Sequence, residues 1–326
     1  MVIKKLFLYE SLYSMKKIVG LILSMVCLTA CNDGDMVFED LNFNENQEIQ
    51  KCKDNELYFK INNNELLLVD FTFGTNGSVL DTLAPLGEMK TLETSNQPKI
   101  YYRTYDGALN TNTICSLVPP ANPKVVSEYT SVTGGTINYT RTMVPVVTES
   151  AVNVTYMYTI NFENITLTNG SSEIRYTTLP YGSYIYDSSK LSFNFSTNFE
   201  FCDHILTGKI SNEMLQLQLP QDFIFPTTKQ TQIIALNNTN LLSYFMFRKT
   251  ISNTEICDFP DDAPPKEEWY VSNGNLEIVS DAITNKATGE VTGYKHVLRL
   301  IDAEFMKDKS SFKLTDRILG TYQVNL

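Results

Sequence analysis

The 326-residue sequence has few of the side chains on which catalytic sites most often depend. Its only histidines are His204 and His296, and it contains a single tryptophan. It also lacks the short motifs of serine hydrolases (GxSxG), zinc peptidases (HExxH), phosphate-binding loops and dinucleotide-binding folds (GxGxxG). With two histidines and no CxxC pair, a zinc site is disfavoured too. We therefore expect no catalytic residues, no metal site and no cofactor, and we interpret both histidines as packing or surface residues.

Positive charge is also scarce. Lysine and arginine number 26 against 37 aspartates and glutamates, so the net charge is −11. Nucleic-acid binding needs a basic face that displaces counterions, and docking on anionic lipid headgroups needs basic clusters. We therefore expect no nucleic-acid partner.

One apolar run stands out, near the start of the chain. Residues Met15 to Ala30 read MKKIVGLILSMVCLTA, which places two lysines before an apolar stretch and small residues after it. This is the layout of a secretory signal, and the run is too short to span a membrane. We expect residues 1–30 to be a signal peptide, with Met15 as a possible true start.

The end of this run, Leu28-Thr29-Ala30-Cys31, resembles a bacterial lipobox. That resemblance implies cleavage before Cys31, a diacylglycerol on its thiol and a third acyl chain on its freed amine. Three acyl chains would anchor the protein stably in a lipid bilayer, because each buried methylene adds roughly 0.8 kcal/mol. The alternative is an ordinary cleaved signal with an incidental cysteine.

The residues after Cys31 extend the resemblance. Acidic residues in Asn32-Asp33-Gly34-Asp35 resemble the surface-export signal of Bacteroidota lipoproteins. The opening CNDGD, the Phe-rich strands and the later ICSLVPPANPKVVSEY are similar to a group of Bacteroidota lipoproteins of unassigned function, over roughly Cys31 to Tyr139. The resemblance implies a lipid-anchored outer-membrane protein exposed on the cell surface, and it brings no catalytic residues.

The mature chain is rich in residues that favour strands. Tyrosine and phenylalanine number 18 each, and apolar residues tend to alternate over residues 57–61, 136–141 and 154–162. Alternation with period two predicts half-buried strands, and we find no convincing helical stripe longer than two turns. Residues 31–326 are too many for one compact sandwich. We therefore expect an all-β protein of two domains.

The sequence also contains an internal duplication. Three blocks in the first half match three in the second half, in the same order, at offsets of 149, 142 and 138 positions. The matched blocks are residues 60–68 with 209–217, 114–124 with 256–266, and 156–184 with 294–322. We interpret the halves as tandem, immunoglobulin-like β-sandwich domains. The expected layout is a tether at residues 31–35, domains at 36–187 and 190–326, and a short join at Ser188-Ser189.

The mature chain contains four cysteines besides Cys31. An exported protein meets an oxidising compartment, where disulfides are expected. Four cysteines allow three pairings, and the duplication selects one, because Cys52 matches Cys202 and Cys115 matches Cys257. We therefore predict the disulfides Cys52–Cys115 and Cys202–Cys257. The alternatives are a metal site or a catalytic thiol.

Three residues are candidates for ligand contact or modification. An exposed Trp269 beside Tyr270 could stack on a sugar ring through its flat face, although the same tryptophan could instead pack over the core. Asp81-Thr82-Leu83 fits the short pattern at which Bacteroidota glycosylate exported proteins on the threonine. An ordinary turn explains that pattern equally well.

These features favour a non-enzymatic module on the cell surface that binds a glycan or a protein partner. An alternative is an extracellular glycoside hydrolase that uses two carboxylates, because acidic residues are plentiful and linear spacing cannot reveal such a pair. A purely structural role in the envelope is a further alternative.

Overall fold

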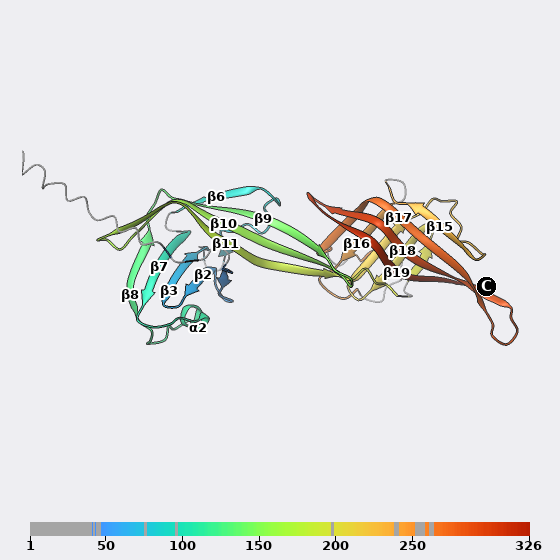
Figure 1. The fold of residues 1–326 in the computed structure, drawn as a ribbon, viewed down its shortest axis with the longest axis horizontal. Coiled ribbons are helices and arrows are strands. Elements are labelled where there is room, and N and C mark those ends of the chain that lie inside the picture. Colours follow the sequence, from blue (N-terminus) through green and yellow to red (C-terminus); the bar gives the residue numbers. More distant parts are fainter. Residues whose placement is uncertain are drawn as a thin grey trace, which may run out of the picture. The chain divides into compact units, whose positions relative to one another are not determined.

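The computed structural model describes residues 41, 43, 47–74, 77–94, 97–196, 199–237, 241–251, 258–260 and 264–326. The expected signal peptide, Cys31 and the tether at 31–35 lie outside these residues. Within them, no helix is long and apolar enough to cross a membrane. Nearly all of the regular structure is strand, as the aromatic and alternating composition predicts (Figure 1).

The first large sheet has nine strands in the order β1-β2-β3-β7-β8-β10-β9-β6, with β11 paired to β10. Their bounds are β1 Gln50–Lys51, β2 Leu57–Asn62, β3 Glu65–Asp70, β6 Met89–Glu93, β7 Lys99–Tyr105, β8 Val125–Ser131, β9 Thr136–Val147, β10 Val152–Thr168 and β11 Glu173–Leu191. A small hairpin, β4 Thr72–Phe73 and β5 Gly77–Ser78, and a short helix, α2 Thr111–Cys115, lie in its connections.

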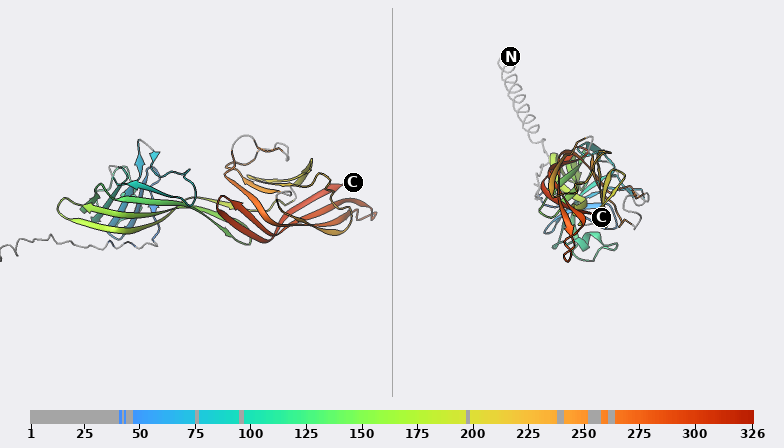
Figure 2. Two further views of the ribbon diagram at one scale, coloured as in Figure 1. Left: turned by 90° about the horizontal axis from the view of Figure 1, so that it is seen from above. Right: turned by 90° about the vertical axis from the view of Figure 1, so that its right-hand side faces the viewer.

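The second large sheet has eight strands in the order β12-β13-β14-β16-β17-β18-β19, with β15 paired to β17. Their bounds are β12 Phe199–Cys202, β13 Ile205–Ile210, β14 Glu213–Gln218, β15 Gln230–Ala235, β16 Leu242–Met246, β17 Glu267–Thr284, β18 Val291–Lys307 and β19 Ser310–Asn325. The chain before β12 bonds to the far edge, since Phe195 N–H donates to Leu319 O at 2.6 Å. An isolated bridge between Ser196 and Gly320 adds to this link, and the curvature of the sheet is visible in Figure 2.

The two sheets repeat one topology, which confirms the duplication. The path β1-β2-β3-β7-β8-β10 of the first sheet corresponds to β12-β13-β14-β16-β17-β18 of the second. The single long strand β17 takes the place of both β8 and β9, and β15 pairs with it as β6 pairs with β9. We call β1–β11 repeat 1 and β12–β19 repeat 2. The protein is therefore an all-β chain of two duplicated β-sandwich domains.

Equivalent turns support this correspondence. Asn63 and Ser211, each with a φ near 55°, begin the β2–β3 and β13–β14 turns. Their carbonyls accept hydrogen bonds from Leu109 N–H and Ile251 N–H, both at 2.8 Å. Strands and turn alike correspond at an offset of 148, since Glu65 begins β3 and Glu213 begins β14 (213 − 65 = 148), so the sequence comparison, which set Asn63 opposite Asn212, was one residue out.

A close backbone approach also recurs. A Cβ on Gly135, between β8 and β9, would lie 3.0 Å from the Cα of Ile165 in β10. A Cβ on Gly274, in β17, would lie 2.5 Å from the Cα of Ala303 in β18. Only glycine fits such contacts without a shift of the neighbouring strand. Each repeat therefore uses a glycine where its strand bends against the next.

The compact units of the structure differ from the sequential domains expected from the sequence. Unit 1 takes in the chain up to Val79, Leu92–Ile137 and Phe162–Pro180. Unit 2 comprises Leu80–Thr91, Asn138–Asn161 and Tyr181–Leu326. The strands β9, β10 and β11 thus supply residues to both units, and the expected join at Ser188-Ser189 lies inside β11. The duplication alone could not reveal this, because it marks equivalent residues and not the core that each one enters.

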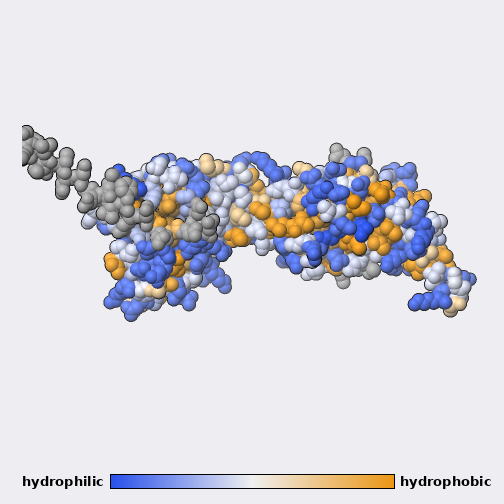
Figure 3. All heavy atoms as spheres, viewed as in Figure 1, coloured by the Kyte–Doolittle hydropathy of each residue, from blue (hydrophilic) through white to orange (hydrophobic). Residues whose placement is uncertain are grey.

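Unit 2 has one continuous apolar core. Repeat 2 contributes most of it, and Phe193, in the segment before β12, stacks on Tyr244 of β16 with ring centroids 4.2 Å apart. The ends of β9 and β10 contribute Met143, Val152 and Val154. On the face drawn in Figure 3, hydrophilic residues cover most of the surface and hydrophobic residues form smaller patches.

Candidate ligand-binding hollow

A buried carboxylate joins four strands inside unit 2. Glu267, the first residue of β17, is fully buried. Its Oε2 accepts hydrogen bonds from Tyr156 Oη and Lys307 Nζ, at 2.7 and 2.8 Å, and from Trp269 Nε1 at 3.2 Å. Its Oε1 accepts from Ser189 Oγ at 2.6 Å. A charge removed from water needs such a full set of donors, so the buried Glu267 carboxylate is satisfied, and the partly exposed Lys307 supplies its counter-charge.

Aromatic rings complete the surroundings of this pair. The ammonium of Lys307 lies 5.4 Å from the ring centroid of Tyr156 and 5.9 Å from that of Trp269. Burial, together with the negative charge of Glu267, raises the pKa of the Tyr156 hydroxyl well above its usual range. Tyr156 is therefore a neutral hydrogen-bond donor at every physiological pH. The cluster ties the end of β10 to β17 and β18 of repeat 2.

A hollow of about 790 Å³ opens beside this cluster, entirely within unit 2. Basic side chains from the two repeats gather on it: Arg141, Arg248, Lys266, Lys307 and Lys309. Carboxylates also line it: Glu88, Asp187, Glu267 and Asp308. We call it the basic hollow.

Two of the five cations are neutralised by direct partners. Lys266 Nζ lies 2.7 Å from Asp187 Oδ1, and Lys307 is paired with Glu267 as described. Asp187 and Glu267 are therefore engaged in ion pairs, while the other two carboxylates of the lining, Glu88 and Asp308, are exposed.

The other three cations form no ion pair among the described residues. Arg248 and Lys309 are exposed. Arg141 is half-buried and donates from Nε to Tyr186 Oη at 2.9 Å and from Nη1 to the Ala84 carbonyl. These bonds orient the guanidinium without neutralising it. The hollow thus holds three cations outside ion pairs, together with the exposed carboxylates of Glu88 and Asp308, in a chain whose net charge is negative.

Of the two possibilities that the sequence left open for Trp269, the structure shows packing in the core, which leaves no exposed face for sugar stacking. Its side chain is fully buried, with its ring 4.8 Å from that of Phe312. Tyr270 is 42% exposed and its hydroxyl donates to Glu268, so its ring is accessible, but Trp269 is not exposed beside it. Successive residues of a strand point to opposite faces, which is why one of this pair enters the core and the other does not.

Thr82 lies in an exposed turn at the edge of the basic hollow. Leu83 N–H donates to Asp81 Oδ1 at 2.8 Å, so the aspartate side chain shapes the turn. Leu83 itself is 88% exposed. The hydroxyl of Thr82 is therefore accessible for modification, and its glycosylation stays a prediction.

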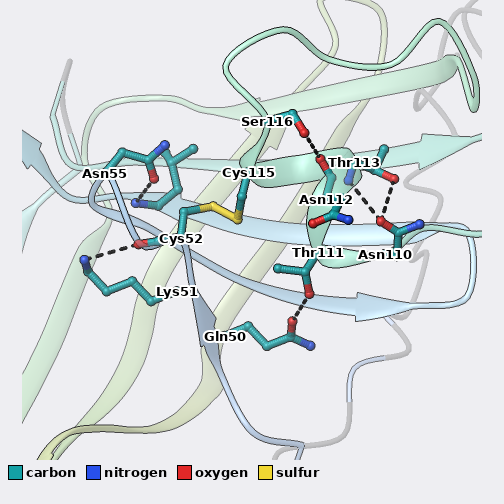
Figure 4. The surroundings of a disulfide bond; sticks show 11 residues. Gln50, Lys51, Cys52, Asn55, Asn110, Thr111, Asn112, Thr113, Cys115 and Ser116 are labelled. Atoms are coloured by element: carbon teal, nitrogen blue, oxygen red, sulfur yellow. Dashed lines mark hydrogen bonds between the residues drawn. A yellow bond between two sulfur atoms is a disulfide. The ribbon is translucent and has the colours of Figure 1, made fainter.

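The structure contains the expected Cys52–Cys115 disulfide, which joins the end of β1 to the end of α2 (Figure 4). Cys202 is also disulfide-bonded. Its expected partner, Cys257, lies outside the described residues, as does Cys31.

His296 packs in the interior, and His204 lies in a turn. His296 is buried, its Nδ1 lies 2.8 Å from Ser280 Oγ, and its ring centroid is 4.9 Å from that of Phe225. Burial lowers the pKa of His296. His204 adopts a φ of 103° at the turn into β13. In the part of the chain that the structure describes, no group of three or more histidine, cysteine or acidic side chains is placed to hold a metal ion.

Sequence reasoning missed the cations of the basic hollow. Arg141, Arg248 and Lys309 lie on strands and turns that are far apart in the chain, and no local pattern marks them. Comparison with known proteins adds no identity: no family model, no curated protein and no solved structure matches the chain.

Proposed function

We propose that this chain is a non-enzymatic lipoprotein of the outer-membrane surface that captures a glycan bearing carboxylate or sulfate groups. The observation that carries the proposal is the set of unpaired cations, Arg141, Arg248 and Lys309, around one hollow. Charge-assisted hydrogen bonds to carboxylate or sulfate oxygens are about twice as strong as neutral ones. The bonds that hold Arg141 reduce the entropy lost when a ligand binds.

The proposed location depends on the lipobox-like sequence and on the acidic residues that follow Cys31. It is tested by growth with a labelled fatty acid and by mass spectrometry of the N-terminal peptide. We expect label on the wild-type protein and none on the Cys31→Ser variant. An unacylated Cys31 in the mature wild-type protein would refute the anchor while leaving the ligand proposal open.

Ligand capture is tested by calorimetry on the soluble chain from residue 32. The probes are polygalacturonate and a sulfated polysaccharide, with neutral dextran for comparison. We expect binding of the charged polymers that weakens as salt rises, because surface charge is screened by salt. In the variant Arg248→Gln/Lys309→Gln we expect at least about ten-fold weaker binding, equal to roughly 1.4 kcal/mol.

The matched control replaces two exposed lysines that do not line the hollow, Lys286→Gln/Lys295→Gln. It removes the same total charge and should change affinity less than two-fold. Equal losses in the two variants would mean non-specific attraction. Absence of binding to both charged polymers would reject the acidic glycan as the ligand.

A further inference from the structure

A second hollow lies in unit 1, on the face of the first sheet that α2 covers. It has a volume of about 750 Å³. Strands β3, β7 and β8 supply its floor, including Leu68, Tyr101 and Arg103. The wall comes from α2 and from the loop that follows it, including Ile114 and the prolines Pro119, Pro120 and Pro123. We call this hollow the proline-walled groove.

The wall is firmly attached. The Cys52–Cys115 disulfide fixes the end of α2 to β1, as Figure 4 shows. The loop after α2 is closed at its base, where Asp106 N–H donates to Lys124 O at 3.0 Å and Lys124 N–H donates to Asp106 Oδ1 at 2.7 Å. Leu109 N–H is held by the turn between β2 and β3. The groove is therefore shaped before any ligand arrives, which lowers the entropic cost of binding.

Repeat 2 shows what the same place looks like when it is filled. Arg103 pairs across the sheet with Leu66, and its equivalent, Phe245, pairs with Met214. The ring of Phe259 covers this position, with centroids 5.0 Å from Phe245 and 5.7 Å from Phe247. In repeat 2, aromatic packing thus occupies the face that is hollow in repeat 1.

Two differences between the repeats account for the opening. A charged Arg103 stands where repeat 2 has Phe245. At the offset that relates the cysteines Cys115 and Cys257, the equivalent of Phe259 is Leu117, which is 96% exposed. Phe259 packs on this face in repeat 2, although it is itself 40% exposed, whereas its counterpart in repeat 1 makes no such cover. Polar groups line the same face in repeat 1.

The polar groups of the groove balance one another. Arg103 Nε lies 2.5 Å from Glu128 Oε2. Asp70 accepts from Thr72 N–H through Oδ1, and the ammonium of Lys124 adds a second cation. With two cations and two carboxylates, the lining has no excess of either charge, unlike the basic hollow.

The floor also offers flat apolar surface. Tyr101 is half-buried, and the guanidinium of Arg103 lies 5.2 Å from its ring centroid. Burial, and next the carboxylate of Asp70, raise the pKa of the Tyr101 hydroxyl, so it is a neutral donor. Tyrosine and proline rings suit the C–H face of a sugar, while planar charged side chains suit hydroxyls that both donate and accept.

We propose that the proline-walled groove binds an uncharged saccharide, at a site separate from the basic hollow and independent of its ligand. The chain would then hold two recognition sites of different chemistry, one in each unit. Both repeats have this sheet face, and it forms a groove in repeat 1, whereas aromatic side chains pack on it in repeat 2.

The test refills the groove with the residues of repeat 2. The variant Arg103→Phe/Leu117→Phe should lose at least ten-fold in affinity for its saccharide. The variant Tyr101→Ser, which introduces the residue at Ser243 of repeat 2, removes the ring without adding bulk and provides a test even if the refilled variant misfolds. Binding is measured by chemical-shift changes in methyl-labelled soluble protein, with gluco-, manno- and xylo-oligosaccharides as probes.

The expected result is binding of a neutral oligosaccharide that is independent of salt and is lost in both groove variants. The basic-hollow variant Arg248→Gln/Lys309→Gln should bind it as the wild type does. If no neutral oligosaccharide shifts the methyl resonances of the groove, or if both groove variants retain wild-type affinity, the proposal is wrong. Either outcome leaves capture of an acidic polymer by unit 2 untouched, so failure of the two proposals can be told apart.

Discussion

Replacing Lys307 by methionine tests whether the buried ion pair holds unit 2 together. The substitution keeps most of the side-chain volume but leaves Glu267, which is fully buried, without a counter-charge. Breaking one partner of a buried pair typically costs about 3–5 kcal/mol, because the remaining charge is desolvated and uncompensated. Three neutral donors still contact the carboxylate, from Tyr156, Trp269 and Ser189, so we expect the lower half of that range.

The assay is urea unfolding followed by tryptophan fluorescence. The chain has one tryptophan, Trp269, and it lies against Glu267 in the core of unit 2. Its signal therefore reports on this unit. The exposed Lys309→Gln variant is the control and should stay within about 0.5 kcal/mol of the wild type.

The decisive comparison is the double variant Glu267→Gln/Lys307→Met. It removes both charges, so its cost should be smaller than the sum of the two single costs by roughly 1–3 kcal/mol, the size of coupling found between residues in contact. A cost below about 1 kcal/mol for Lys307→Met would contradict the reasoning. So would a double variant whose cost equals the sum of the two single costs.

Three further outcomes are expected. Burial lowers the pKa of His296, so the stability that its neutral form contributes is present above the unfolded-state pKa of about 6.5 and is lost as pH falls through the lower folded-state pKa. Urea titrations between pH 8 and 5 should therefore show the free energy of unfolding decreasing as pH falls. The variant His296→Asn should reduce this pH dependence. Removing the disulfide with Cys52→Ala/Cys115→Ala should destabilise unit 1 by about 4 kcal/mol, since the bond spans 63 residues, and hydrogen exchange in β2 and β3 should report it. Gly274→Ala should cost more than about 2 kcal/mol, because its Cβ would lie 2.5 Å from the Cα of Ala303, and an unchanged melting temperature would show that β17 can move aside.

The secondary structure and the repeat were predictable because both leave local marks. Alternating residues at 154–162 predicted a strand that the structure extends to Val152–Thr168. The pairing of Cys52 with Cys115 followed from equivalent positions rather than from any geometry. These inferences need only the sequence near each residue and a second copy to compare it with.

The functional surfaces were not predictable in the same way. The sequence left open whether Trp269 is exposed or packs over the core, and alternation along β17 places it in the core and Tyr270 outside. The basic hollow depends on how the ends of β9–β11 meet repeat 2 within unit 2. Arg141 and Lys309 enter one site only through that packing, which no linear spacing encodes.

The interleaving of the two units constrains the order in which the chain can fold during synthesis. Met143, Val152 and Val154 leave the ribosome well before the residues at 199–325 that complete their core. Until those residues follow, the apolar tips of β9 and β10 have nothing to cover them. A truncation after the first repeat should therefore expose Met143, Val152 and Val154 and yield an aggregation-prone fragment instead of a half-sized protein.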